Sequence, residues 1–131
     1  MRYKYYQPND KDIKDNYGDC TIRALSKALD VSWVEAFDLQ VPICREYQTP
    51  NIFALPVRLE NEAMGKLGFK YTGISNKKGS KRPTVEEFAK KHPKGRYVCN
   101  VSHHEVAVVD GYYYDTRDSG FKALYGYYEL I

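Results

Sequence analysis

Up to position 91, apolar residues recur at the spacing of an α-helix. The first apolar stripe predicts a helix that begins at Asp19 or Cys20 and ends at Leu29. Two capping boxes, in which a serine or threonine is followed three residues later by a glutamate, predict two further helices. The segment between Pro42 and Pro50 stays unassigned. The helices expected are therefore 20–29, 33–39, 57–66 and 85–91.

After position 95 the pattern becomes that of β-strands. Asp110-Gly111 lies between two apolar stretches and is a strong signal for a two-residue hairpin turn. The strands expected are 2–6, 69–72, 96–101, 105–109, 112–116 and 124–130. Helices that precede a run of antiparallel strands predict an α+β fold, in which N-terminal helices pack on an antiparallel β-sheet.

Composition and charge place the chain among single-domain globular proteins. Its 131 residues fit one domain, 1–131, and a hydrophobic content of 43% excludes disorder. Twenty basic residues against 17 acidic ones give a charge of +3, too weak a balance to predict nucleic-acid binding. No apolar run approaches the length of a membrane span, and the N-terminus lacks a signal-like apolar segment. We therefore expect no membrane partner and a cytoplasmic location.

The chain has three cysteines, Cys20, Cys44 and Cys99, an odd number without the spacing of a disulfide framework or a zinc ribbon. This pattern predicts free thiols in a reducing compartment, with neither a metal nor another cofactor. Zinc ligation by Cys20 together with His103, His104 and Asp115 is disfavoured, because adjacent residues on a strand point to opposite faces.

Cys20 is the strongest candidate for chemistry. If Asp19 is the N-cap, Cys20 lies in the first helical turn, where unpaired backbone N–H groups and the positive end of the helix favour a thiolate. Arg23, one turn further on, adds positive charge. The Cys20 N–H could also donate to an oxyanion. The carboxylate of Asp19 would oppose thiolate formation unless it caps the helix.

A cysteine nucleophile needs a base, and the hairpin register selects one. With Asp110-Gly111 as the turn, His104 and Asp115 are diagonal neighbours on one face, within reach of a side-chain contact. Because Val106 and Val108 share this face, we expect it to pack against the helix of Cys20. The alternative pair, His103 with Asp118, lies on the other face, and a one-residue slip in register would exchange the two pairs. The catalytic residues expected are Cys20, His104 and Asp115.

These segments carry a resemblance to a known family. Residues 18–25 (GDCTIRAL), residues 104–111 (HEVAVVDG) and Tyr114-Asp115-Thr116 resemble small papain-like proteins encoded by phages and bacteria. They are also similar to C39-type peptidase domains, in which a cysteine opens a helix and a histidine begins a later strand. The resemblance runs from Gly18 to about Tyr128. It implies the papain-like cysteine protease fold, with Cys20 as nucleophile, His104 as base and Asp115 as the orienting acid.

The sequence departs from this family at the oxyanion hole. Papain-like peptidases usually carry a glutamine a few residues before the cysteine, whereas this chain has Lys14, Asp15 and Asn16 there. Asn16 could donate instead, as could Gln7 if the loop folds back. The oxyanion donor is therefore left open between these two side chains.

The function expected is a thiol hydrolase, a cysteine peptidase, isopeptidase or amidase that forms an acyl-enzyme on a protein or peptide substrate. Transfer of the acyl group to an amine, or deamidation, is not excluded. The alternative is a catalytically inactive papain-like binding module, such as a phage protein that binds and inhibits a host protein in the host cytoplasm. Its contact surface would be the tyrosines of the C-terminal strands. These are Tyr112, Tyr113, Tyr125, Tyr127 and Tyr128.

Overall fold

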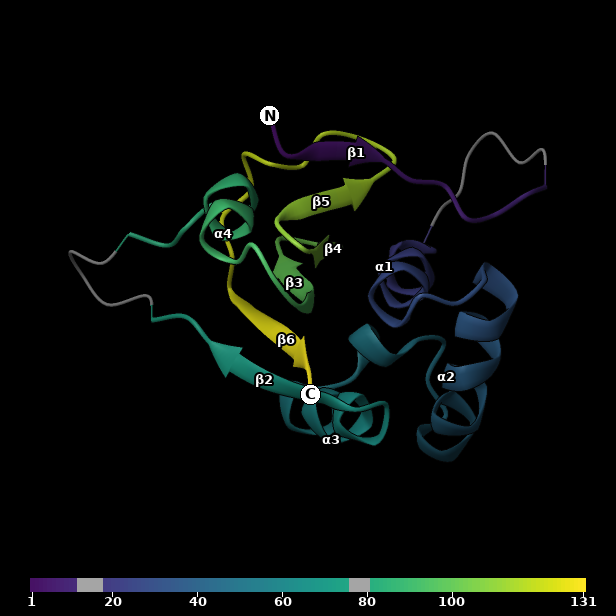
Figure 1. Cartoon of the computed structure of the whole chain (residues 1–131). Helices are drawn as coiled ribbons and strands as arrows, with labels where there is room; N and C mark the ends of the chain where they lie inside the picture. Colours follow the sequence, from purple (N-terminus) through teal and green to yellow (C-terminus); the bar gives the residue numbers. More distant parts are fainter. Residues whose placement is uncertain (12–17, 76–80) are drawn as a thin grey trace.

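The computed structural model describes residues 1–11, 18–75 and 81–131, and its centre is a mixed six-stranded sheet. The strands are β1 (Tyr3–Tyr5), β2 (Phe69–Gly73), β3 (Arg96–Val101), β4 (His104–Val109), β5 (Tyr112–Asp115) and β6 (Gly126–Leu130). They lie in the order β1-β5-β4-β3-β6-β2 (Figure 1). The α+β class expected from the sequence is therefore confirmed.

The sheet is not wholly antiparallel. β1 pairs in parallel with β5, with Tyr3 opposite Tyr113, whereas the other pairs run antiparallel. The expectation of an antiparallel sheet is wrong at this edge, because hydrophobic alternation identifies a strand without giving its direction. The β4–β5 hairpin has the expected register, with Val109 opposite Tyr112. Asp110 and Gly111 both have positive φ, as a type I′ turn requires.

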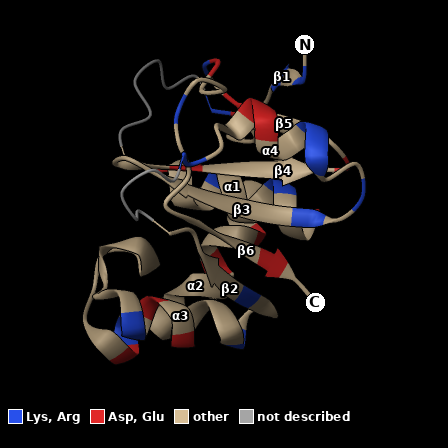
Figure 2. Ribbon diagram, turned by 90° about the vertical axis from the view of Figure 1, so that its left-hand side faces the viewer, with Lys and Arg blue, Asp and Glu red and all other residues tan. Residues whose placement is uncertain are grey.

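Within residues 1–11, 18–75 and 81–131, four α-helices and one short 3-10 helix cover the sheet. They are α1 (Cys20–Leu29), α2 (Trp33–Tyr47), η1 (Ile52–Ala54), α3 (Val57–Lys66) and α4 (Val85–Lys91). Both expected capping boxes are formed, at Ser32 and at Thr84. In α4 the glutamates lie in the first turn and the lysines in the last, which complements the helix dipole (Figure 2). No helix in the described part of the chain is both long and apolar enough to cross a membrane.

α2 continues through Pro42 instead of ending near Leu39. Proline lacks the N–H that would bond to the preceding turn, so local preference argues for a break. Pro42 is exposed, however, and the same helix buries Ala36 and Ile43 in the core. Packing of the buried face therefore outweighs the local cost of the proline.

Two apolar clusters fill the two sides of the sheet. One side is covered by α1, α2 and α3, and its cluster includes Leu25 and Ala107. The other side is covered by α4, and its cluster includes Phe88 and Val106. Figure 1 shows α1 and α4 on opposite sides of β3 and β4. Arg96 of β3 donates to two carbonyl groups at the end of α1, which fastens this helix against the sheet.

Candidate active site

Cys20 is the first residue of α1, and its side chain is partly exposed. At this position the helix leaves the first N–H groups without intrahelical partners. The Sγ atom lies close enough to the His104 side chain and to the backbone N–H of Glu105 for both groups to lower the pKa of the thiol. The thiol therefore lies between the start of α1 and the start of β4.

His104 and Asp115 come from neighbouring antiparallel strands. His104 is the first residue of β4, and Asp115 is the last residue of β5. The imidazole Nε2 and the carboxylate Oδ2 are 2.6 Å apart, a short hydrogen bond. Because Nε2 is engaged by Asp115, Nδ1 is the ring nitrogen left to face Cys20. The structure thus brings together the three residues that the sequence analysis selected.

Cys20 and His104 perturb each other in opposite directions. Burial alone would raise the pKa of the Cys20 thiol, but the His104 hydrogen bond and charge, the Glu105 N–H and the Arg23 charge together lower it. Burial would likewise lower the pKa of His104, but hydrogen bonds and charge at Asp115 and Cys20 raise it to about 9. Both shifts favour a thiolate–imidazolium pair at neutral pH.

The expected contact of this hairpin face with α1 is wrong. Val106 and Val108 pack in the cluster under α4, whereas Ala107 faces α1. His104 and Asp115 nevertheless reach α1, because each lies at the end of its strand. There the first turn of α1 meets them, with Cys20 near His104 and Arg23 paired to Asp115.

Asp115 is buried and surrounded by donors. Besides His104, its Oδ2 accepts from the Ser119 hydroxyl at 2.8 Å, and its Oδ1 accepts from the Thr116 N–H at 2.7 Å. The guanidinium of Arg23 lies 3.6 Å from Oδ1. Burial would raise the pKa of Asp115, but these bonds lower it, led by the bond from His104. The carboxylate is therefore held ionised and in a fixed orientation. Sequence spacing gave no signal for the roles of Ser119 and Thr116.

Asp19 occupies the N-cap position but does not cap the helix with its side chain. Its carboxylate instead forms a buried ion pair with Arg23 and accepts a 3.2 Å bond from the indole N–H of Trp33. The pairing with Arg23, rather than the helix cap, compensates the charge of Asp19 beside the thiol. Arg23 contacts both Asp19 and Asp115 and so links the two carboxylates.

A second buried acidic group, Glu105, lies near Cys20. Both carboxyl oxygens of Glu105 are bonded by the amide of Asn100, and the side chain is buried. Burial raises the pKa of Glu105 well above its ordinary value, and the charges of Glu60 and Cys20 raise it further. Glu60 is also buried and accepts from the Tyr128 hydroxyl. This buried acid pair favours the protonated state of Glu105 next to a Cys20 thiolate.

The oxyanion donor was expected to be Asn16 or Gln7. Asn16 lies outside the described residues. Gln7 follows β1, and its side-chain oxygen accepts from the Asn9 N–H. No hydrogen bond joins Gln7 to Cys20 in the described part of the chain, and this candidate is not brought to the thiol. The Cys20 N–H, left free by its place at the start of α1, is the donor that the described residues offer.

The alternative pair, His103 and Asp118, is not brought together. His103 lies in the turn before β4, exposed and with positive φ. Asp118 accepts from the Tyr113 hydroxyl at 2.5 Å and from the Gly120 N–H at 3.0 Å. Its carboxylate therefore organises the loop after β5. The described residues contain no group of three or more His, Cys, Asp or Glu side chains arranged to hold a metal ion.

The tyrosines suggested as a contact surface divide into two groups. Tyr113 and Tyr128 are buried in the two clusters and cannot contact a partner. Tyr112, Tyr125 and Tyr127 keep partial exposure. The alternation of a half-buried sheet explains the split, so the five do not form one continuous patch.

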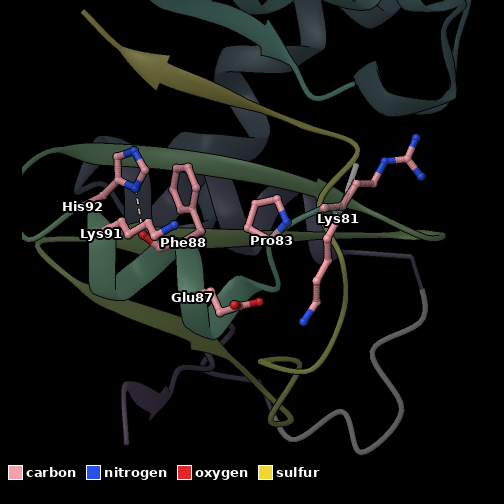
Figure 3. A pocket seen from close by; sticks show the side chains of 7 residues that line it. Lys81, Pro83, Glu87, Phe88, Lys91 and His92 are labelled. Carbon is pink, nitrogen blue, oxygen red and sulfur yellow. Dashed lines mark hydrogen bonds between the residues drawn. The ribbon is translucent and has the colours of Figure 1, made fainter. Parts of the chain in front are cut away.

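A hollow of about 180 Å³ lies on the α4 side of the sheet (Figure 3). Its lining includes Lys81, Lys91 and the stacked pair Phe88–His92, whose ring centroids are 3.8 Å apart. His92 donates from Nδ1 to the Phe88 carbonyl, which ties the imidazole to its own helix. This hollow is separated by the sheet from the α1 side and takes no part in the Cys20 site.

Comparison of the chain with protein-family models, curated proteins and solved structures gave no match in any of the three.

Proposed function

We propose that the protein is a thiol hydrolase of papain-like type, which cleaves a peptide, isopeptide or side-chain amide bond through an acyl-enzyme on Cys20. The observation that carries this proposal is the placement of Cys20, at the start of a helix, close enough to His104 for each to shift the other's pKa, while the imidazole of His104 is hydrogen-bonded to Asp115. A nucleophile, a base and a group that orients the base are the minimum for nucleophilic acyl transfer. The resemblance of the two motifs to papain-like peptidases supports the same assignment.

The roles follow from the contacts. The Cys20 thiolate attacks the carbonyl carbon, and the Cys20 N–H at the start of α1 stabilises the oxyanion. His104, protonated at Nδ1, gives its proton to the leaving amine as the C–N bond breaks, which leaves a thioester on Cys20. Water then attacks the thioester while His104 accepts one of its protons, the C–S bond breaks, and the carboxylic acid product leaves the Cys20 thiolate beside protonated His104. Asp115 holds Nε2 of His104 throughout.

The other cysteines provide an internal control. Cys99 is buried, and burial raises the pKa of its thiol; burial also raises the pKa of Cys44. We therefore expect a limiting amount of iodoacetamide at neutral pH to label Cys20 first, as read by peptide mapping. His104→Ala should slow labelling of Cys20 while leaving the Cys44 rate unchanged. Equal, slow labelling of the three thiols would refute the proposal.

A further inference from the structure

A stripe of apolar side chains on α2 leads away from the candidate active site. The indole of Trp33 bonds to Asp19, the residue before Cys20, and stacks on Phe37 with ring centroids 5.5 Å apart and planes inclined by 7°. Val41 and Cys44 continue the stripe at helical spacing. α2 lies beside α1 (Figure 1), so this stripe begins next to the nucleophile.

The stripe opens into a groove of about 320 Å³ between α2 and the turn that follows it. This volume lies at the lower end of the range for ligand sites, roughly 300–1,000 Å³. Phe37, Val41, Cys44 and Pro50 supply apolar lining. A groove of this composition suits an apolar side chain better than a charged one.

Two polar side chains that line the groove offer an acceptor for the N–H and a donor for the C=O of a peptide unit. Gln40 is only 3% exposed and lines the groove, yet its Oε1 has no hydrogen-bond partner in the described structure. A buried acceptor of this kind is costly unless a donor reaches it, and a backbone N–H is such a donor. Arg45, which also lines the groove, is exposed, and its guanidinium can donate to a carbonyl oxygen.

We propose that this groove binds an apolar side chain of an extended polypeptide substrate, together with its peptide unit. From Trp33 to Val41 the helix rises about 12 Å. An extended chain covers that distance in roughly three to four residues. The apolar residue therefore lies about three or four residues from the bond that Cys20 attacks. The position of the apolar residue relative to the cleaved bond rests on the proposed function. The binding of the apolar side chain rests on the groove alone.

The test uses the Cys20→Ala chain, which can bind a peptide without acylation, and a displayed library of random heptapeptides. We expect the selected peptides to share an apolar residue at one fixed position. Phe37→Ala should weaken binding of a selected peptide about tenfold, because the fit of one apolar group in a pocket is worth at least that factor. Leu39→Ala is the matched control, because Leu39 is 43% exposed against 41% for Phe37, on the same helix but outside the groove. It should change the dissociation constant by less than about twofold.

A second measurement links the groove to the nucleophile. In the unmodified chain, a selected peptide should slow iodoacetamide labelling of Cys20 and leave the rate at an added small thiol unchanged. The inference would be overturned if the selected peptides shared no apolar position. Equal effects of Phe37→Ala and Leu39→Ala would overturn it as well, and so would peptide binding that does not protect Cys20. Slow labelling of Cys20 in the free chain would instead refute the thiol chemistry, while the comparison of Phe37→Ala with Leu39→Ala would still decide the groove.

Discussion

His104 Nε2 and Asp115 Oδ2 lie 2.6 Å apart although eleven positions separate the two residues in the chain. Two adjacent strands and a two-residue turn fix this distance, so the pair is a product of hairpin register rather than of a mobile loop. The carboxylate has further donors on both oxygens, which leaves little freedom for the imidazole that it holds.

The rate of Cys20 alkylation should begin to rise at a lower pH than the rate of an ordinary thiol. The hydrogen bond and charge of His104 lower the thiol pKa against the opposing effect of burial, so the midpoint should lie below the ordinary value of 9.0. His104→Ala removes this contribution and should move the midpoint upward. Iodoacetamide rates measured by mass spectrometry in a Cys44→Ser background would give both midpoints. An unchanged midpoint in His104→Ala would show that His104 does not lower the pKa of Cys20.

Amide cleavage should have an alkaline limit that alkylation lacks. The pKa of His104 is raised to about 9, so the imidazolium that the proposed mechanism uses to protonate the leaving amine disappears above that pH. Alkylation needs only the thiolate and should stay on its plateau. With any peptide substrate that the chain cleaves, kcat/KM should fall above pH 9 while the iodoacetamide rate does not. A parallel fall of both rates would argue against general-acid catalysis by His104.

Asp115→Asn should lower the pKa of His104, because it removes the charge and the acceptor that stabilise the imidazolium. Cleavage should drop about 10²-fold or more, the usual contribution of a positioned acid–base group. NMR titration of the His104 ring would report the pKa directly. Asp118→Asn is the control, since this carboxylate bonds to Tyr113 and not to His104. A larger effect of Asp118→Asn than of Asp115→Asn on the His104 pKa would contradict the assignment of Asp115 as the partner of His104.

Arg23→Met should destabilise the fold by about 3–5 kcal/mol, because it leaves buried carboxylates without their partner. Urea unfolding followed by circular dichroism would measure the change. Arg58→Met is the matched control, because the Arg58–Glu62 pair is exposed and should be worth less than about 0.5 kcal/mol. Combining Arg23→Met with Asp19→Asn should recover part of the loss. No recovery would mean that Asp115 alone accounts for it.

Stability should decrease with rising pH through the titration of Glu105. Burial raises the pKa of Glu105 above its ordinary value of 4.5, so the folded chain binds a proton that the unfolded chain has already lost. Stability from this group is complete below pH 4.5 and is lost as the pH passes the folded pKa. Glu105→Gln should flatten the dependence of the unfolding free energy on pH, to which one carboxyl group contributes at most about 1.4 kcal/mol per pH unit.

The sequence was sufficient for the local parts of the site and insufficient for its surroundings. Helix spacing placed Cys20 at a helix start, and the Asp110-Gly111 turn fixed the register that joins His104 to Asp115. Alternation could not say which helix would cover which face, because it separates two faces of a strand without naming their partners. The assignment of Val106 to the α1 side therefore failed.

Tertiary contacts decided the remaining differences. Arg23 was expected to add charge near the thiol, but its pairing with both Asp19 and Asp115 depends on the meeting of α1 with β5. The sequence pattern predicts a helix only as far as Leu39 and leaves the segment between Pro42 and Pro50 unassigned, whereas the burial of neighbouring side chains carries α2 past Pro42. The oxyanion donor depends on a loop conformation that spacing does not encode, and Asn16 lies outside the described residues.

The parallel pairing of β1 with β5 has a consequence for the timing of protein synthesis. Tyr6 and Tyr3 both bond to the Asp115 carbonyl, so the first strand has to wait for β5 before it can pair. Cys20 is likewise synthesised before His104 and Asp115, by roughly 5–20 s at translation rates of about 5–20 residues per second. During that time α1 carries a thiol without its base. We therefore expect the nascent chain to have no hydrolytic activity until β5 is made. A fragment that ends before β5 should likewise cleave no amide bond.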